Sequence, residues 1–454
     1  MRICLWFLVA ISVTSSSFAV TKSRYEELEL FNKVLYLIES QYYRPVDTNK
    51  LIEGAIKGMM DTLDPHSTFL SKEFYKKMQA DTDGEFGGLG IEVTQKDGVI
   101  YVVTPIDDTP AYRAGIQAKD KIVEINHESI LGFTLDEAID KMKGKEGSKV
   151  HLGILREGVK GVQHFTLKRE KIIVKAVKSF LLEEKYAFIR LTQFQRRSAK
   201  DINKAIKRLN KKSGGLKGIV LDLRSNPGGL LDEAIKVSSL FLKEGVVVST
   251  ESRDPNNKNI HYVIKSMDKY LDIPLVVLVN GASASASEIV AGALQDHNRA
   301  IIMGSQTFGK GSVQTVVAID NSNEHGVKLT IAQYMTPKNR KIQALGISPD
   351  IKIADMDINW VSEHKKRENF IREKDLRNHL TATVETKEEK KLRLKEEKEA
   401  RIRRAEKIRN RDKSKKKKTE NDIFKKYHPK NDYQALQAVK FLQTYKFFKN
   451  FNQK

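Results

Sequence analysis

The sequence contains a single cysteine among its 454 residues. This residue, Cys4, lies in an N-terminal segment that looks like a cleavable export signal, so we expect the mature chain to have no cysteine. A chain without cysteine cannot form disulfides, thiolate metal sites or a cysteine nucleophile. The apolar run from Ile3 to Val13 is shorter than the ~20 residues that cross a bilayer.

Two features flank this apolar run. Arg2 provides the positive charge that precedes it, and Ser17-Phe18-Ala19 provides a small-x-small cleavage site. They predict a signal peptide over residues 1–19. The protein would then be exported to the periplasm or cell envelope of a bacterium. A signal that is retained as a membrane anchor is the alternative.

The positive charge is unevenly distributed. The formal net charge is +22, and residues 361–430 hold 26 Lys and Arg against 14 Asp and Glu. No aromatic residue lies between Phe370 and Phe424, which argues against a tail that stacks on nucleic-acid bases. We therefore expect residues 356–430 to form a charged, helical or partly disordered arm. Contact with an anionic membrane surface is an alternative role for it.

Hydrophobic periodicity divides the rest of the chain. The pattern is helical over residues 24–80 and changes to short alternating strands over 84–170. From about residue 173 to 355, continuous apolar runs typical of strands covered on both faces alternate with helices. The pattern predicts an α/β multidomain protein. Its expected parts are a helical N-terminal region (20–83), a β-rich domain (84–172), an α/β core (173–355) and a C-terminal amphipathic helix (431–454).

The candidate chemistry lies in two loops of the α/β core. Ser285 stands in a run of small residues, and Lys310 stands between two glycines with apolar neighbours nearby. A serine hydroxyl becomes a good nucleophile when a base takes its proton, and a desolvated lysine can be that base. Ser283 and Ser287 are the competing serines. We expect Ser287 to cap the following helix instead.

Six motifs in order resemble those of the carboxyl-terminal processing proteases, PDZ-containing serine peptidases of bacterial envelopes and chloroplasts. The motifs are Leu63-Asp64-Pro65-His66-Ser67, Gly87-Gly88-Leu89-Gly90-Ile91, Asp222 to Gly229, Ser283 to Glu288, Thr307 to Gln314, and Gly346 to Asp350. The resemblance covers roughly residues 24–355. It implies a PDZ-like β-rich domain joined to an α/β serine protease core of crotonase-like or ClpP-like topology.

The resemblance also assigns catalytic roles. It places the nucleophile on Ser285, the general base on Lys310 and a residue that orients the lysine on Gln314. The oxyanion hole would combine the backbone N–H of Ala286 with that of Gly228 or Gly229. Such donors stabilise the negative charge that develops on the attacked carbonyl oxygen.

In the PDZ-like domain, the resemblance places the binding of a peptide C-terminus on Gly88, Leu89, Gly90 and Ile91. A peptide bound there adds a strand to the sheet edge, and its carboxylate lies in a nest of backbone N–H groups. The chain has Lys143 where relatives often carry an arginine thought to couple peptide binding to activation. Lysine lacks the planar fork of arginine.

Other chemistries fit the sequence less well. Gly304 to Gly311 nearly matches a phosphate-binding loop, but Gly311 stands where a magnesium-binding Ser or Thr is required, and a strand is expected where a helix should begin. The serine run is not a G-x-S-x-G elbow, and His127-Glu128 lacks a second histidine four residues on. We expect no metal and no cofactor.

The sequence thus predicts an exported serine endopeptidase that recognises the C-terminal tails of loosely folded proteins and cleaves them upstream. A non-enzymatic PDZ scaffold is the alternative. Because a lysine base must be uncharged, activity should rise from about pH 6 toward roughly 8–9.

Relatives also suggest a homo-oligomer formed through the amphipathic segment Asp432–Phe448, and an adaptor lipoprotein that delivers substrates is a further candidate partner. Nucleic acid is not an expected partner.

Overall fold

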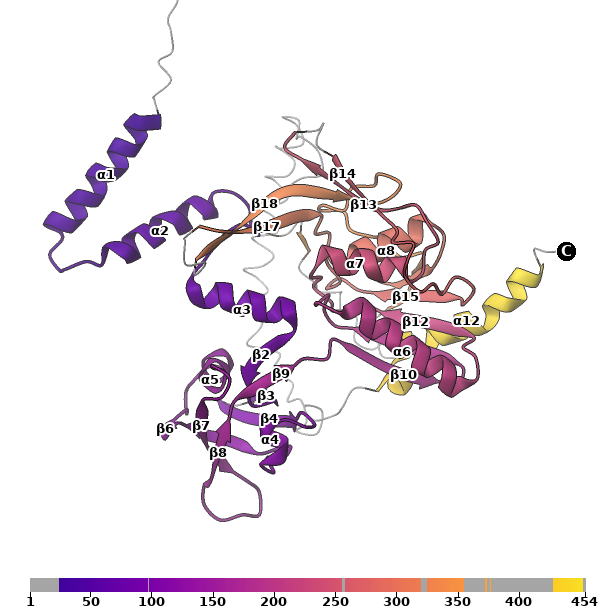
Figure 1. Ribbon diagram of the computed structural model, residues 1–454, viewed down its shortest axis with the longest axis horizontal. Coiled ribbons are helices and arrows are strands. Elements are labelled where there is room, and N and C mark those ends of the chain that lie inside the picture. The colour runs from indigo at the N-terminus through magenta and orange to yellow at the C-terminus, as the bar shows by residue number, and fades with distance from the viewer. Residues whose placement is uncertain are drawn as a thin grey trace, which may run out of the picture. The chain divides into compact units, whose positions relative to one another are not determined.

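The computed structural model describes residues 24–96, 98–254, 258–319, 325–354, 372–373, 376 and 428–451. The predicted signal peptide and almost all of the predicted charged arm lie outside these residues. The chain divides into two compact units, residues 1–60 and 61–454 (Figure 1). Within the described ranges, no helix is both long and apolar enough to cross a membrane.

The described residues of the first unit form two helices, α1 and α2. α1 (Arg24–Gln41) buries none of its residues, and α2 (Thr48–Asp61) runs to the unit boundary. Apolar side chains of α1, among them Leu28, Phe31 and Val34, are exposed. An amphipathic helix with an exposed apolar face lacks the packing that normally stabilises it.

The described PDZ-like part of the second unit combines two small sheets with three helices. Its main sheet has the strand order β3-β4-β5-β7-β8, with β6 paired to β5, and β2 pairs separately with β9. The elements are α3 (Lys72–Asp83), β2 (Glu85–Gly88), β3 (Ile91–Lys96), β4 (Val99–Pro105), α4 (Pro110–Arg113), β5 (Lys121–Ile125), β6 (Glu128–Ser129), α5 (Leu135–Met142), β7 (Lys149–Leu155), β8 (Gln163–Lys168) and β9 (Glu170–Ile173). A separate hydrophobic core fills this part.

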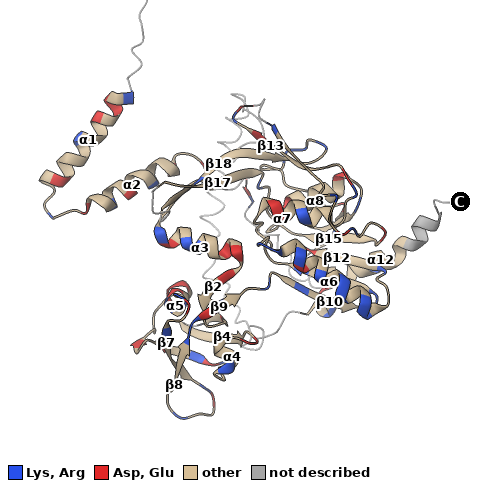
Figure 2. Cartoon of the chain, viewed as in Figure 1, with Lys and Arg blue, Asp and Glu red and all other residues tan. Residues whose placement is uncertain are grey.

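The protease part is built on a six-stranded sheet of order β10-β11-β12-β15-β16-β19, parallel from β11 onward. Its elements are β10 (Val177–Leu182), β11 (Tyr186–Leu191), α6 (Ser198–Ser213), β12 (Gly218–Asp222), α7 (Leu231–Ser239), β15 (Leu275–Val279), α8 (Ala286–Asp296), β16 (Ile301–Gly304) and β19 (Ile351–Lys352). All residues of β12 and β15 are buried, as their continuous apolar runs predict. Lys and Arg side chains gather on α6 (Figure 2).

A second, antiparallel sheet adjoins the first. Its order is β1-β18-β13-β14, with β17 paired to β18. The strands are β1 (Thr68–Leu70), β13 (Val246–Ser252), β14 (Lys258–Tyr262), β17 (Ser312–Ala318) and β18 (Gly326–Met335). Because β17 is a strand, the segment after Lys310 is not the helix that a phosphate-binding loop requires.

The C-terminal helix covers the other face of the parallel sheet. α6, α7 and α8 enclose one apolar core, and α12 (Tyr433–Phe451) packs against β12 and β15 on the opposite side, preceded by the short helix η2 (Pro429–Asn431). Ala435, Val439 and Leu442 of α12 are buried there. A Cβ at Gly218 would lie 2.9 Å from Leu442 Cδ1, so glycine permits this close approach. The amphipathic segment predicted to form an oligomer therefore packs within its own chain.

We predict that Leu442→Ala lowers the free energy of unfolding by about 2–5 kcal/mol, because it leaves a cavity between α12 and the sheet. Urea unfolding followed by circular dichroism measures this loss. Lys440→Ala on the exposed side of the same helix is the matched control and should change stability little. Equal stability of the two variants would contradict the docking of α12.

Candidate active site

Ser285 stands at the sharp turn between β15 and α8. Its φ of 54° places a non-glycine residue in a rarely populated backbone region, and Ala286 begins the helix. Such strain is common at reacting residues when surrounding contacts enforce it. The expectation that Ser287 caps α8 is wrong: Ser285 is the cap residue, and the helix begins two residues earlier than a cap at Ser287 requires. Ser287 lies in its first turn, and its hydroxyl donates to Asn226 O at 3.0 Å.

Lys310 lies in the loop between β16 and β17. Burial lowers the pKa of Lys310 to about 8, and the positive charge of Lys328 lowers it further, whereas Glu373, Glu288 and Asp64 act in the opposite direction. An amine with a pKa of about 8 is neutral often enough near neutral pH to accept a proton. Desolvation of this lysine was expected from its glycine and apolar neighbours in the sequence.

A buried carboxylate joins the two loops. Glu288 has no exposed surface, and each of its two oxygens accepts two hydrogen bonds. Oε2 accepts from the backbone N–H of Ser285 and of Lys310, both at 2.8 Å. Oε1 accepts from Thr307 Oγ1 at 2.5 Å and from the N–H of Gly309 at 2.7 Å. One side chain thus fixes the backbone positions of Ser285 and Lys310 relative to each other.

Burial raises the pKa of Glu288 to about 7, while its four hydrogen bonds favour the charged form. A protonated carboxyl oxygen is a donor, so protonation of Glu288 would remove at least one of the hydrogen bonds that it now accepts. Loss of the carboxylate below about pH 7 would therefore loosen both loops. Protonation of Glu288 and protonation of a lysine base would both lower activity as the pH falls.

The turn Asn226-Pro227-Gly228-Gly229 lies directly against Ser285. A Cβ at Gly228 would stand 2.8 Å from Ser285 Cβ and 3.0 Å from Ala286 N, so only glycine fits. The N–H of Gly228 donates to Asn226 Oδ1 at 2.9 Å. Among the described residues, no acceptor is found for the N–H of Ala286 or of Gly229. These two groups are therefore the donors available to an oxyanion.

Gln314 belongs to a neighbouring polar network. Its amide donates to Ser312 Oγ at 2.8 Å and to Thr330 Oγ1 at 3.2 Å, and Thr330 in turn donates to Asp64. Within the described part of the chain, no hydrogen bond links Gln314 to Lys310, or Ser285 Oγ to Lys310 Nζ. The predicted orienting role of Gln314 therefore stays a prediction.

The predicted peptide-binding residues line one cavity of about 330 Å³ in the PDZ-like part. Gly88, Leu89, Gly90 and Ile91 form one wall, and residues of α5 contribute to the lining. Gly90 has a φ of 74° and is packed so closely against Thr109 that no side chain fits. The cavity is also lined by Gln193 and Gln195, which precede α6 of the protease core.

The comparisons with known proteins agree with this arrangement. Family models match for peptidase family S41 (residues 185–353), a PDZ domain (77–155) and the activating protease CtpB N-terminal domain (10–74). The chain is 43% identical over 381 residues to a carboxy-terminal-processing protease of Bartonella bacilliformis, covering 84% of this chain and 86% of the relative. It belongs to the S41 carboxy-terminal processing proteases.

Two further proteins resemble this S41 protease. The carboxy-terminal processing protease CtpA of Bacillus subtilis is 38% identical over 331 residues, which cover 73% of this chain and 69% of the relative. A solved photosystem II D1 C-terminal processing protease is 29% identical, with a TM-score of 0.43, and the match covers 72% of this chain and 93% of that one. The family models and the two curated relatives confirm the predicted family and fold class: a PDZ domain is combined with a serine-type S41 core.

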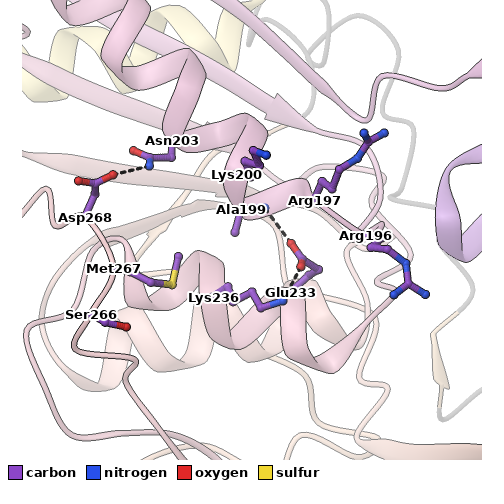
Figure 3. Close-up of a pocket in the computed structure, with 10 residues that line it drawn as sticks. All are labelled: Arg196, Arg197, Ala199, Lys200, Asn203, Glu233, Lys236, Ser266, Met267 and Asp268. Atoms are coloured by element: carbon purple, nitrogen blue, oxygen red, sulfur yellow. Dashed lines mark hydrogen bonds and ion pairs between the residues drawn. The ribbon is translucent and has the colours of Figure 1, made fainter.

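A second cavity, of about 470 Å³, lies at the start of α6 in this S41 protease (Figure 3). Two of its acidic groups are engaged by other residues of the lining. Glu233 accepts from the N–H of Ala199 and pairs with Lys236, and Asp268 accepts from Asn203. Ser285 and Lys310 are not among its lining residues. We therefore read it as part of the α6–α7 packing and not as the catalytic site.

A buried ion cluster lies next to the turn that contains Gly228 and Gly229. Arg224 binds Asp222 at 2.8 Å, and it also binds Asp432, which precedes α12, and Gln434 in the first turn of α12, each at 2.7 Å. Burial alone would lower the pKa of Arg224, but the hydrogen bonds and charges of Asp222 and Asp432 raise it above its ordinary value. Asp222 and Arg224 thus form a buried structural ion pair.

The sequence analysis did not identify Glu288 as the residue that joins the two loops. It also did not identify Lys328 and Asp64 as charges that act on Lys310. Glu288 follows Ser285 by three residues, which is the capping-box pattern and could have indicated the first of its contacts. Its contacts with the Thr307–Lys310 loop lie 19 to 22 residues away in the sequence and depend on the folded core.

We predict that Glu288→Gln lowers kcat at least ~100-fold, because an amide nitrogen cannot accept the hydrogen bonds of two backbone donors and the reacting groups lose their alignment. Steady-state kinetics with a peptide substrate measures the loss. The control is Glu184→Gln, at an exposed turn of the same core. Wild-type kcat in a folded Glu288→Gln protein would contradict the role of this carboxylate.

Proposed function

We propose that this protease is a serine–lysine endopeptidase, with Ser285 as nucleophile and neutral Lys310 as general base. The observation that carries the proposal is the buried Glu288, whose carboxylate binds the backbone of both residues. Ser285 Oγ attacks the scissile carbonyl carbon. Lys310 Nζ takes the hydroxyl proton and returns it to the leaving amine, and water then releases the acyl group.

The proposal assigns the oxyanion to Ala286 and Gly229. Their N–H groups have no acceptor in the described part of the chain, whereas the N–H of Gly228 is engaged by Asn226. Of the two glycines predicted as oxyanion donors, Gly229 is therefore favoured over Gly228. Gln314 would support the base indirectly, through Thr330 and Asp64, whose negative charge acts on Lys310.

Substrate selection belongs to the PDZ cavity in this proposal. The groove between β3 and α5 would take a substrate's C-terminus as an added strand, with its carboxylate at Gly88–Ile91. Apolar lining from Ile91, Val93 and Met142 favours apolar tail residues. Lys143 lines the same cavity, with its ammonium 4.8 Å from the Phe86 ring centroid.

The deciding experiment compares wild type with Ser285→Ala and Lys310→Ala. Each is incubated with an unstructured substrate that ends in apolar residues, and with the same substrate ending in Asp-Asp. We expect both variants to lose at least ~1000-fold in kcat/KM, and wild type to prefer the apolar tail. Lys338→Ala, at an exposed position of the core, is the control.

The pH profile of wild type belongs to the same experiment. Below the pKa of about 8, the neutral fraction of Lys310 rises about tenfold per pH unit, so kcat/KM should rise from pH 6 and level off near 9. A flat profile, or full activity of Lys310→Ala, would exclude Lys310 as the base.

Export and self-association complete the proposal. The proposal of export rests on the signal-like residues 1–19, and the proposal of self-association rests on the exposed apolar side chains of α1. N-terminal sequencing of the mature protein should begin at Val20. Light scattering should give a mass above that of one chain, and a monomer would remove self-association from the proposal.

A further inference from the structure

A short piece of the C-terminal segment lies against the catalytic loop. The N–H of Glu373 donates to Phe308 O at 3.1 Å. Arg372 donates to Leu345 O at 2.8 Å and to Gln306 Oε1 at 3.2 Å. Phe308 precedes Lys310 by two residues, so this contact holds the turn that carries the proposed base.

The Glu373 side chain is fully buried beside that turn. Its carboxylate binds His66 Nε2 at 2.7 Å and accepts from Gln343 Nε2 at 2.9 Å. Gln343 in turn accepts from the N–H of Gly311 at 2.9 Å. Glu373 therefore fixes the loop on both sides of Lys310, through Phe308 before it and through Gln343 and Gly311 after it.

The charges around Lys310 have opposing effects. Lys328 disfavours the ammonium form, and the carboxylates of Glu373, Glu288 and Asp64 favour it. Glu288 holds backbone groups of the catalytic loops and Asp64 holds Ser67 and Thr330, so both are part of the folded core. Glu373 alone among these carboxylates comes from beyond the last core strand, β19.

We propose that Glu373 is a positioning residue for the catalytic lysine. Its hydrogen bonds fix the turn that carries Lys310. Its negative charge favours the ammonium form of Lys310, so Glu373 lowers the activity of the protease at neutral pH. The effect on activity rests on the proposed function, in which Lys310 is the base. The effect on Lys310 itself does not, because it can be measured without turnover.

The test measures the ionisation of Lys310 directly. Competitive labelling with acetic anhydride between pH 6 and 11, read by mass spectrometry of the peptide containing Lys310, is carried out on full-length protein in the Ser285→Ala background. Adding Glu373→Gln should shift the labelling midpoint of Lys310 to lower pH by at least about half a unit, because an attracting charge is removed. Glu157→Gln, at an exposed position of the PDZ-like part, should not shift it.

Two further variants separate charge from packing. Glu373→Asp keeps the charge and should leave the midpoint close to that of the parent protein. Arg372→Ala weakens the attachment of the segment and should shift the midpoint in the same direction as Glu373→Gln. Thermal unfolding identifies any variant that fails to fold, and in that case Arg372→Ala carries the test.

Activity gives the second readout. With Ser285 restored, Glu373→Gln should move the acid limb of the kcat/KM profile to lower pH and raise activity at pH 6.5 about threefold or more. An unchanged or higher labelling midpoint in folded Glu373→Gln would overturn the inference and leave the proposed function intact. Full activity of Lys310→Ala would instead overturn the proposed function, whatever the labelling shows.

Discussion

The active site depends on one buried carboxylate. The positions of Ser285 and Lys310 come from different loops, and neither loop has regular structure to hold it. Glu288, on the first turn of α8, accepts four hydrogen bonds from these loops. A charge buried this deeply is tolerated only when all its acceptor positions are used. The same condition fixes the backbone of Ser285 relative to that of Lys310, which is the geometry on which the proposed mechanism depends.

The rest of the fold positions the first turn of α8. The parallel sheet ends β12 and β15 side by side, so the glycine turn after β12 meets the serine turn after β15. Ala284 N–H and Ser287 Oγ both bind the carbonyl of Asn226, which joins the two turns. Ligand sites beyond the carboxyl ends of parallel strands follow from this arrangement. The antiparallel sheet then brings the lysine loop and the Asp64 network to the same place.

Much of this arrangement could be predicted from the sequence. The apolar runs of β12 and β15, and α5 at Leu135–Met142, follow from local patterning. The helix start at Ser285 was misplaced because a strained serine and a capping serine look alike in sequence. The contacts of Glu288 with the lysine loop, and those of Glu373, could not be predicted, because a buried carboxylate finds donors far away in the chain. The docking of α12 on its own sheet could not be predicted either, because an amphipathic pattern does not identify the surface against which a helix packs.

Arg224 has a consequence for how the enzyme is made. This buried guanidinium lies next to the glycine turn, and two of its partners, Asp432 and Gln434, are 208 and 210 residues further along the chain. A ribosome that has synthesised the whole parallel sheet has still not supplied them. The support behind the glycine turn is therefore complete only after α12 has packed against the sheet. A chain that ends before residue 432 would fold its parallel sheet without two of the groups that hold this guanidinium in place.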